Sequence, residues 1–167
     1  DEGSAALGKN TSWKNLKKLN LSQNSIGNQG TISIAENPAW NYLEVLDLSF
    51  NKISGEGASA LSGNTTWTNL KVLSLEKNAI NHSGASKIVM NAAWINLEEL
   101  YLFENAISEE PAKGLMPNQA WSKIKTMVCH VKNEVVANFL DEEFIDEVIN
   151  IPSSGFDDSD AILVGKS

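Results

Sequence analysis

The feature that most constrains this chain is a tryptophan that recurs every 27 residues, at five positions in the sequence. Each one is preceded three residues earlier by an asparagine and followed three residues later by a leucine or an isoleucine. A fixed period of roughly 20–50 residues is typical of chains built from stacked copies of one small unit. We therefore predict a solenoid in which each unit contacts its neighbours. The five positions are Trp13, Trp40, Trp67, Trp94 and Trp121.

The repeated unit reads N-x-x-W-x-N-L-x-x-L-x-L-x-x-N-x-I-x-x-x-G-x-x-x-L, which predicts one strand and one helix. Leu19 and Leu21 alternate with polar Asn20, the pattern of a strand with one buried face. The glycine-led second half, as in residues 57–61 and 84–90, predicts a short helix. Strands in a sheet lie about 4.8 Å apart, whereas packed helices need about 8–10 Å. The stack should therefore curve, with its strands on the concave face and its helices on the convex face.

Two further columns of residues are expected to hold the units together. An asparagine follows each strand where the chain turns inward, so its amide can bond the backbone of the next turn and satisfy groups that would otherwise be buried unpaired. The tryptophans are expected to pack between the sheet and the helices, each with a hydrogen-bond partner for its indole N–H. The turn asparagines are Asn24, Asn51, Asn78 and Asn105.

The L-x-x-L-x-L-x-x-N-x-I core of this unit resembles the leucine-rich repeat, over residues 1–132. The 27-residue length and the glycine-led helical half resemble the ribonuclease-inhibitor-like subtype. The N-x-x-W-x-N-L variant resembles arrays from bacteria that live inside eukaryotic cells. The resemblance implies an α/β leucine-rich repeat solenoid: a right-handed horseshoe arc of five parallel strands, with helices outside. It also implies a protein–protein interaction module, and a bacterial effector that acts on a host protein.

The two ends of the array differ from its middle. Residues 1–9 supply a helix with no strand or polar cap before it, so we expect the natural chain to extend upstream. Beyond residue 132 an apolar stripe at helical spacing predicts a helix that caps the last repeat. We divide the chain into a leucine-rich repeat array with a partial first repeat, residues 1–132, and an acidic C-terminal capping helix and tail, residues 133–167. The stripe comprises Val135, Val136, Phe139, Leu140, Phe144, Val148 and Ile149.

The two segments differ in net charge, and the charge of the chain argues against some classes of partner. Residues 1–132 hold 12 acidic residues and 12 lysines, whereas residues 133–167 hold nine acidic residues and one lysine. The net charge of −8 and the absence of arginine argue against nucleic acid or an anionic membrane as a partner. No apolar run approaches the roughly 20 residues that cross a bilayer. The single cysteine, Cys129, favours a reducing, intracellular setting, which includes secretion into a host cell.

Residues suited to catalysis or metal binding are few. His82 is expected in a solvated turn before a helix, and His130 follows Cys129. Cys129 and His130 are neighbours on a predicted strand, so they point to opposite faces and do not form a nucleophilic pair. The sequence has no phosphate-binding loop, nucleophile elbow or metal-ligand spacing. We therefore predict no enzymatic activity, cofactor or metal; catalysis centred on His130 is the enzymatic alternative.

Strand alternation predicts which side chains the concave face exposes. Most solvated strands carry small polar residues, such as Ser22 and Ser49 here, yet the later strands carry aromatic residues among charged ones. Exposed aromatic side chains with a charged rim are typical of a protein-binding hot spot. The alternative is that they only pack on one another across the strands. The predicted partner-binding residues are Val45, Asp47, Phe50, Val72, Glu76, Lys77, Glu99, Tyr101, Phe103, Glu104 and His130.

One charged column is predicted to be structural, because its sign alternates from each repeat to the next and opposite charges should lie side by side. This column comprises Lys17, Glu44, Lys71, Glu98 and Lys125. We expect the whole chain to act as a monomeric module that binds a protein partner through its concave sheet. Two alternatives stay open: a structural scaffold or spacer of a larger protein whose activity lies elsewhere, and docking of a basic partner on the acidic C-terminal helix.

Overall fold

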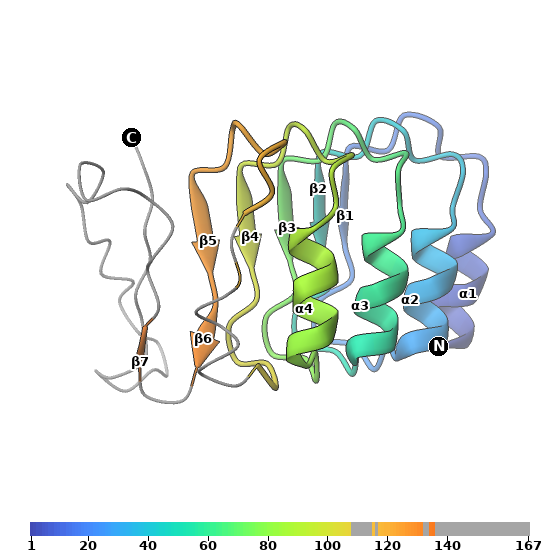
Figure 1. Ribbon diagram of the computed structural model, residues 1–167. Helices are drawn as coiled ribbons and strands as arrows, with labels where there is room; N and C mark the ends of the chain where they lie inside the picture. The colour runs from blue at the N-terminus through green and yellow to red at the C-terminus, as the bar shows by residue number, and fades with distance from the viewer. Residues whose placement is uncertain (108–114, 116, 132–133, 136–167) are drawn as a thin grey trace.

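The computed structural model describes residues 1–107, 115, 117–131 and 134–135, and helices alternate with strands along them (Figure 1). The helices are α1 (Glu2–Gly8), α2 (Asn28–Ala35), α3 (Gly55–Ser62) and α4 (His82–Val89). The strands of the main sheet are β1 (Lys18–Asn20), β2 (Val45–Asp47), β3 (Val72–Ser74), β4 (Glu99–Tyr101) and β5 (Thr126–Val128). Two shorter strands, β6 (His130–Val131) and β7 (Glu134–Val135), pair antiparallel with each other.

The main sheet consists of five parallel strands in the order β1-β2-β3-β4-β5. Every pairing joins residues 27 positions apart, so that Leu73 lies between Leu46 and Leu100. Each strand is three residues long, because one L-x-L segment is all that a unit contributes before the chain turns. The predicted α/β solenoid with five parallel strands and helices on one side is confirmed.

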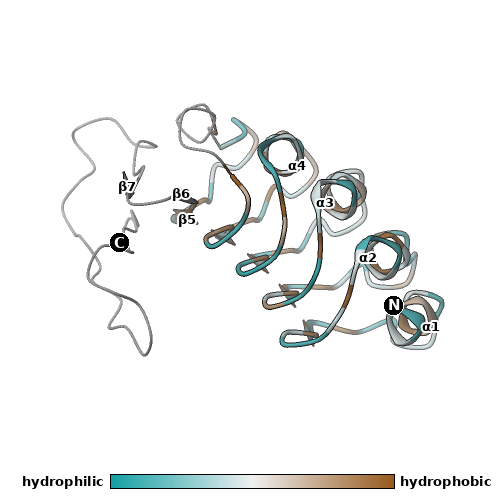
Figure 2. Cartoon of the chain, turned by 90° about the horizontal axis from the view of Figure 1, so that it is seen from below, coloured by the Kyte–Doolittle hydropathy of each residue, from teal (hydrophilic) through white to brown (hydrophobic). Residues whose placement is uncertain are grey.

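The stack of repeats is curved. Figure 2 shows helices α1–α4 fanning apart more widely than the strands to which they are joined, so the sheet lines the inner side of the bend. The reason is the predicted one: a helix is wider than a strand, and packed helices need about twice the spacing. The sheet is therefore the concave face and the helices cover the convex face.

The core between sheet and helices is formed by the tryptophan and leucine columns. Trp40, Trp67 and Trp94 are fully buried, and Trp121 is 2% exposed. The ring centroids of neighbouring indoles lie 6.4 Å apart, both for Trp67 with Trp94 and for Trp94 with Trp121. Trp13, in the first repeat, is 43% exposed.

The expectation that every indole N–H has a partner is wrong for three of these tryptophans. Trp121 donates to the carbonyl of Asn91 at 2.7 Å, but the indole N–H groups of Trp40, Trp67 and Trp94 are buried without a hydrogen bond. An unsatisfied buried donor costs about 1–3 kcal/mol. Burying the 150–250 Å² of an aromatic side chain contributes about 4–6 kcal/mol at 25 cal/mol per Å². The apolar burial therefore outweighs the lost hydrogen bond.

Three of the turn asparagines, Asn51, Asn78 and Asn105, bond the backbone of the repeat that precedes them. Asn78 donates its amide to the carbonyls of Leu48, Leu75 and Glu76 at 3.0–3.1 Å. Its carbonyl oxygen accepts from the backbone N–H of Ile53 at 2.9 Å. The same pattern recurs at the asparagines one repeat earlier and one repeat later, Asn51 and Asn105.

A second asparagine column, the one that opens each unit, supports the other end of the helices. Asn37 donates to the carbonyls of Gly8 and Asn10, at 2.7 and 2.9 Å. Asn64 in turn donates to Ala35 at 2.8 Å. These buried amides satisfy carbonyl groups at or just after the C-terminal end of the preceding helix, which would otherwise lack a partner.

Close helix packing explains the glycine of the unit. A Cβ atom at Gly84 would lie 2.7 Å from the Cα of Gly55 in the neighbouring helix, closer than carbon atoms approach.

His82 departs from the prediction, because it is the first residue of α4 rather than part of a solvated turn. Its side chain is half-buried, with Nε2 3.1 Å from the hydroxyl of Ser86.

Most of the predicted C-terminal cap lies outside the described residues. Within residues 133–167 only Glu134–Val135 are described, as strand β7. The prediction is wrong at Val135, the first residue of the helical stripe, because it pairs with His130 in an antiparallel strand. The rest of the capping helix and the acidic tail lie outside the described residues and stay a prediction.

Candidate protein-binding face

The concave surface is formed by the first and third residues of each strand, because the second residue points into the core. The pairing register places Val72 between Val45 and Glu99. In the next row Ser74 lies between Asp47 and Tyr101. All of these side chains are half-buried. The sheet therefore holds residues from three repeats on one continuous surface.

The turn after each strand adds another row to this surface. Phe50, Lys77 and Glu104 occupy equivalent positions, and their φ values of 55°, 50° and 52° place them in the left-handed region. Gln23 in the first repeat has the same conformation, with φ 56°. A residue with a Cβ atom in this region costs roughly 1–2 kcal/mol. The backbone hydrogen bonds from Phe50 N to Glu76 O and from Lys77 N to Phe103 O keep the turns in register.

Side chains of this turn row contact one another from repeat to repeat. The ammonium of Lys77 lies 4.8 Å from the centre of the Phe50 ring, a cation–π contact. The same ammonium is 3.2 Å from a carboxylate oxygen of Glu104. Lys77 is thus held between an aromatic ring and a carboxylate, and this arrangement links three repeats.

Two of the carboxylates on the sheet have partners within the face. Asp47 accepts hydrogen bonds from the amide and hydroxyl of Ser49, at 3.0 and 2.6 Å, and from the Asn20 side chain at 3.2 Å. Glu99 accepts a hydrogen bond of 2.8 Å from the hydroxyl of Tyr101. Burial, followed by this bond, raises the pKa of Tyr101 well above its ordinary value.

Glu76 differs from the other carboxylates of the face. It is half-buried two residues after the end of β3, and within the described part of the chain its carboxylate accepts no hydrogen bond, although its backbone carbonyl accepts from Phe50 and Asn78. Burial raises its pKa above the ordinary value, and the nearby charges of Asp47 and Glu104 add to this effect. The charge of Lys77 acts in the opposite direction.

The structure brings ten of the eleven predicted residues onto one surface, which we call the β2–β4 face. His130 belongs to strand β6, and its side chain lies outside the described residues. The partner-binding role of these residues stays a prediction. The β2–β4 face comprises Val45, Asp47, Phe50, Val72, Glu76, Lys77, Glu99, Tyr101, Phe103 and Glu104.

Sequence reasoning missed how the polar residues of the face are fixed. Ser49 was expected to be exposed, but it is 4% exposed because its hydroxyl turns back to Asp47. In the first repeat Ser22 bonds Asn20 in the same way, at 2.7 Å. The signal was available, since an Asp or Asn two residues before a serine is typical of an Asx turn.

The predicted charged column runs along the sheet beside this face. Glu44 contacts Lys17 at 3.0 Å and Lys71 at 2.8 Å, and Glu98 contacts Lys125 at 2.6 Å. Hydrogen bonds from Lys71 and Lys17 lower the pKa of Glu44 to about 2. The column therefore joins repeats through exposed ion pairs, as predicted.

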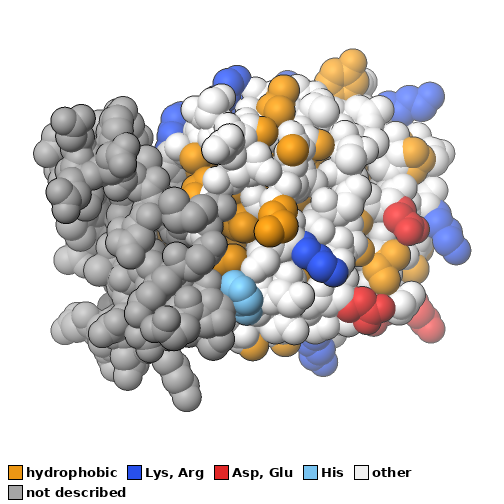
Figure 3. All heavy atoms as spheres, in the orientation of Figure 1, with side chains coloured by type: hydrophobic (Ala, Val, Ile, Leu, Met, Phe, Trp, Pro, Cys, Tyr) orange, Lys and Arg blue, Asp and Glu red, His pale blue; other side chains and the backbone are white. Residues whose placement is uncertain are grey.

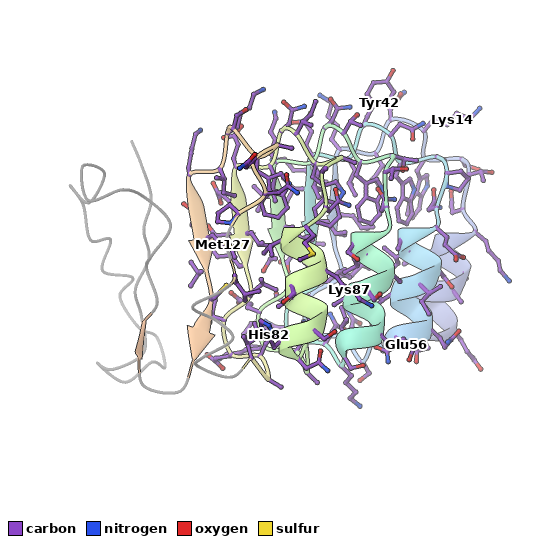
Figure 4. The ribbon with its side chains drawn as sticks, viewed as in Figure 1. Lys14, Tyr42, Glu56, His82, Lys87 and Met127 are labelled. Carbon is purple, nitrogen blue, oxygen red and sulfur yellow. The ribbon has the colours of Figure 1, made fainter. Side chains whose placement is uncertain are left out.

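The convex surface has a different character. Figure 3 shows it as mainly uncharged polar side chains and backbone, with separate charged and hydrophobic side chains scattered among them. In Figure 4, Glu56 and Lys87 lie on the helix layer, and Tyr42 lies on the loops at one edge. The ammonium of Lys87 donates to the hydroxyl of Ser59 at 2.9 Å. No comparable meeting of aromatic and acidic side chains is recorded among the described helices.

Cys129, one of the few residues suited to nucleophilic chemistry, is not activated in this structure. Cys129 is 3% exposed in a core column, and burial raises the pKa of its thiol to about 12, which opposes formation of a nucleophilic thiolate. No three His, Cys, Asp or Glu side chains come together to hold a metal ion in the part of the chain that the structure describes. None of the described helices has the length and hydropathy of a membrane-spanning segment.

Comparison with known families agrees with the fold. The leucine-rich repeat family model matches residues 14–35, 41–62 and 68–89. Each match begins one residue after a tryptophan and ends at the last residue of α2, α3 or α4. Three of the repeated units therefore match the leucine-rich repeat, and the described residues have the fold of a leucine-rich repeat solenoid. Repeats of this family commonly mediate protein–protein interaction. No curated protein shows significant similarity to the chain.

Proposed function

We propose that this chain is a protein-recognition module that binds a protein partner on its β2–β4 face. The observation that supports it most is the position of Tyr101 and Phe103 on the accessible side of the sheet, where the fold itself needs only small polar residues. Aromatic residues are enriched among the side chains that dominate protein–protein binding energy. Equivalent positions on this face carry different side chains in different repeats, whereas equivalent core positions carry the same one. This difference also supports a role in recognition.

The partner is proposed to be a host protein, and the chain to be an effector. The N-x-x-W-x-N-L unit resembles arrays of bacteria that live inside eukaryotic cells, which supports a host protein as the partner and an effector role. A ribonuclease-inhibitor-like arc has an open concave face, which can accept a folded domain or a peptide. We propose that the chain acts as a monomer and that binding, not catalysis, is its activity.

The test is a quantitative binding measurement with a partner identified by crosslinking in a host lysate. The double variant Tyr101→Ala/Phe103→Ala should weaken the purified complex by about 2 kcal/mol or more, which is roughly 30-fold. The matched control is Tyr42→Ala/Met90→Ala, which removes two exposed side chains outside the face, 56% and 71% exposed. Equal affinities of the wild-type chain and the Tyr101/Phe103 variant would exclude this face and favour a scaffold role.

A further inference from the structure

The carboxylates of the β2–β4 face are not equally engaged. Asp47 is held by Ser49 and Asn20, Glu99 by the hydroxyl of Tyr101, and Glu104 by Lys77. Glu76 has no such partner within the described part of the chain. With four carboxylates and one lysine, the face carries an excess of negative charge. Its charge therefore complements a cationic surface.

The position of Glu76 is unfavourable for the fold. A half-buried carboxylate without a hydrogen-bond donor loses part of its hydration and gains nothing in return. Asp47 and Glu104 lie close enough to repel it. A glutamine of the same shape would avoid both penalties. Residues whose replacement would not lower the stability of the fold are common at binding sites, because such sites often sacrifice stability for function.

Lys77 shows what kind of group this face accommodates. Its ammonium lies between the ring of Phe50 and the carboxylate of Glu104. Tyr101 and Glu76, from neighbouring repeats, add the same two kinds of group to this face, and the charge of Glu76 acts on the ionisation of Tyr101. An alkylammonium or guanidinium side chain combines an apolar stem with a charged head, so it can contact Val72 or the Tyr101 ring while it pairs with a carboxylate.

We propose that the β2–β4 face binds a cationic segment of its protein partner, with one lysine or arginine side chain paired with the Glu76 carboxylate. The proposal rests on the proposed function and adds the chemistry of the partner. Phosphate-rich partners are disfavoured, because the same carboxylates repel them. The apolar side chains of the face give the segment a second requirement, an aliphatic or aromatic residue beside the cationic one.

The test uses a displayed library of random 12-residue peptides, selected on the immobilised full chain. Peptides that also bind the Tyr101→Ala/Phe103→Ala chain are removed. We expect the remaining peptides to be enriched in lysine or arginine next to an apolar residue. Glu76→Gln should weaken them about tenfold, since a charge-assisted hydrogen bond is lost. The control Glu56→Gln, on the convex face, should leave their affinity unchanged.

The outcomes separate this inference from the proposed function. Selected peptides that lack basic residues, or that bind Glu76→Gln as tightly as wild type, would overturn the inference and leave the proposed function intact. A selection in which no peptide distinguishes the wild-type chain from the Tyr101/Phe103 variant would count against the proposed function itself. Urea unfolding of Glu76→Gln supplies a fold check, and we expect its midpoint to match or exceed that of wild type.

Discussion

The core and the concave face of this chain are built on the same 27-residue period, yet they use it differently. In the core, equivalent positions hold the same residue in successive repeats, such as the fully buried Trp40, Trp67 and Trp94. On the concave face, equivalent positions change from valine to glutamate between β3 and β4, and from aspartate through serine to tyrosine across β2, β3 and β4. Packing between repeats therefore constrains the first set, and the fold leaves the second set free to vary.

This difference gives a rule for separating structural from functional residues in a repeated chain. A residue that recurs at every period contributes to the stacking of units, so replacing it should mainly affect stability. A residue whose type differs from that of the equivalent positions in the other repeats is not required by stacking, so its role must lie in contacts made at that one place. Tyr101 and Glu76 are the clearest departures on the face, and the experiments above test them.

The largest loss of stability is expected from a tryptophan in the middle of the stack. Trp67→Ala removes a fully buried indole that stacks on Trp94, and it should lower the free energy of unfolding by about 3–5 kcal/mol. Trp13→Ala, in the same column but 43% exposed, should cost about 1–2 kcal/mol. Urea unfolding followed by circular dichroism measures both values. Equal losses at the two positions would show that column identity, rather than burial between repeats, sets the energy.

A somewhat smaller loss is expected from a turn asparagine. Asn78→Ala leaves three carbonyl groups and the N–H of Ile53 without their side-chain partner, which should lower the free energy of unfolding by about 2–4 kcal/mol. In the first repeat, Asn24 donates to carbonyls of its own loop, so Asn24→Ala should cost about 1 kcal/mol. The measurement is again urea unfolding. An Asn24 variant as unstable as the Asn78 variant would contradict the role assigned to bonds between repeats.

The smallest effect is expected from the exposed charged column, and it should depend on pH. The pKa of Glu44 is lowered from 4.5 to about 2, by hydrogen bonds from Lys71 and Lys17. A lowered carboxyl pKa contributes stability that is present above pH 4.5 and is lost as the pH falls toward 2. Glu44→Gln should therefore unfold with a weaker pH dependence between pH 4.5 and 2. Glu36→Gln, outside the column, is the control; if both variants keep the wild-type slope, the ion pairs are not coupled to folding.

The fold could be predicted from the sequence because the period repeats the same evidence five times. A single L-x-L segment does not decide between a strand and another structure. Leu46, Leu73 and Leu100, spaced by one period, align in one register only if parallel strands stack. The alternating charges of Lys17, Glu44 and Lys71 could be predicted for the same reason. Repetition fixes which residues become neighbours, so contacts between equivalent positions follow from the spacing alone.

Contacts between non-equivalent positions could not be predicted in this way. The bond from Tyr101 to Glu99 joins residues two apart on one strand and depends on side-chain rotamers, which the period does not specify. The left-handed conformation of Phe50 is also invisible in its residue type, because glycine or asparagine normally occupies this region. The missing partners of the buried indoles depend on how closely the rings stack, a property of the assembled core.

The direction of the hydrogen bonds between repeats has a consequence for how the protein is made. Asn78 bonds Leu48, Asn64 bonds Ala35 and Trp121 bonds Asn91, and in each case the side chain reaches back about one repeat. A ribosome synthesises the chain from its N-terminus, so each new unit meets a surface that has already emerged. Growth of the native structure can therefore keep pace with synthesis, one unit at a time, without waiting for distant sequence.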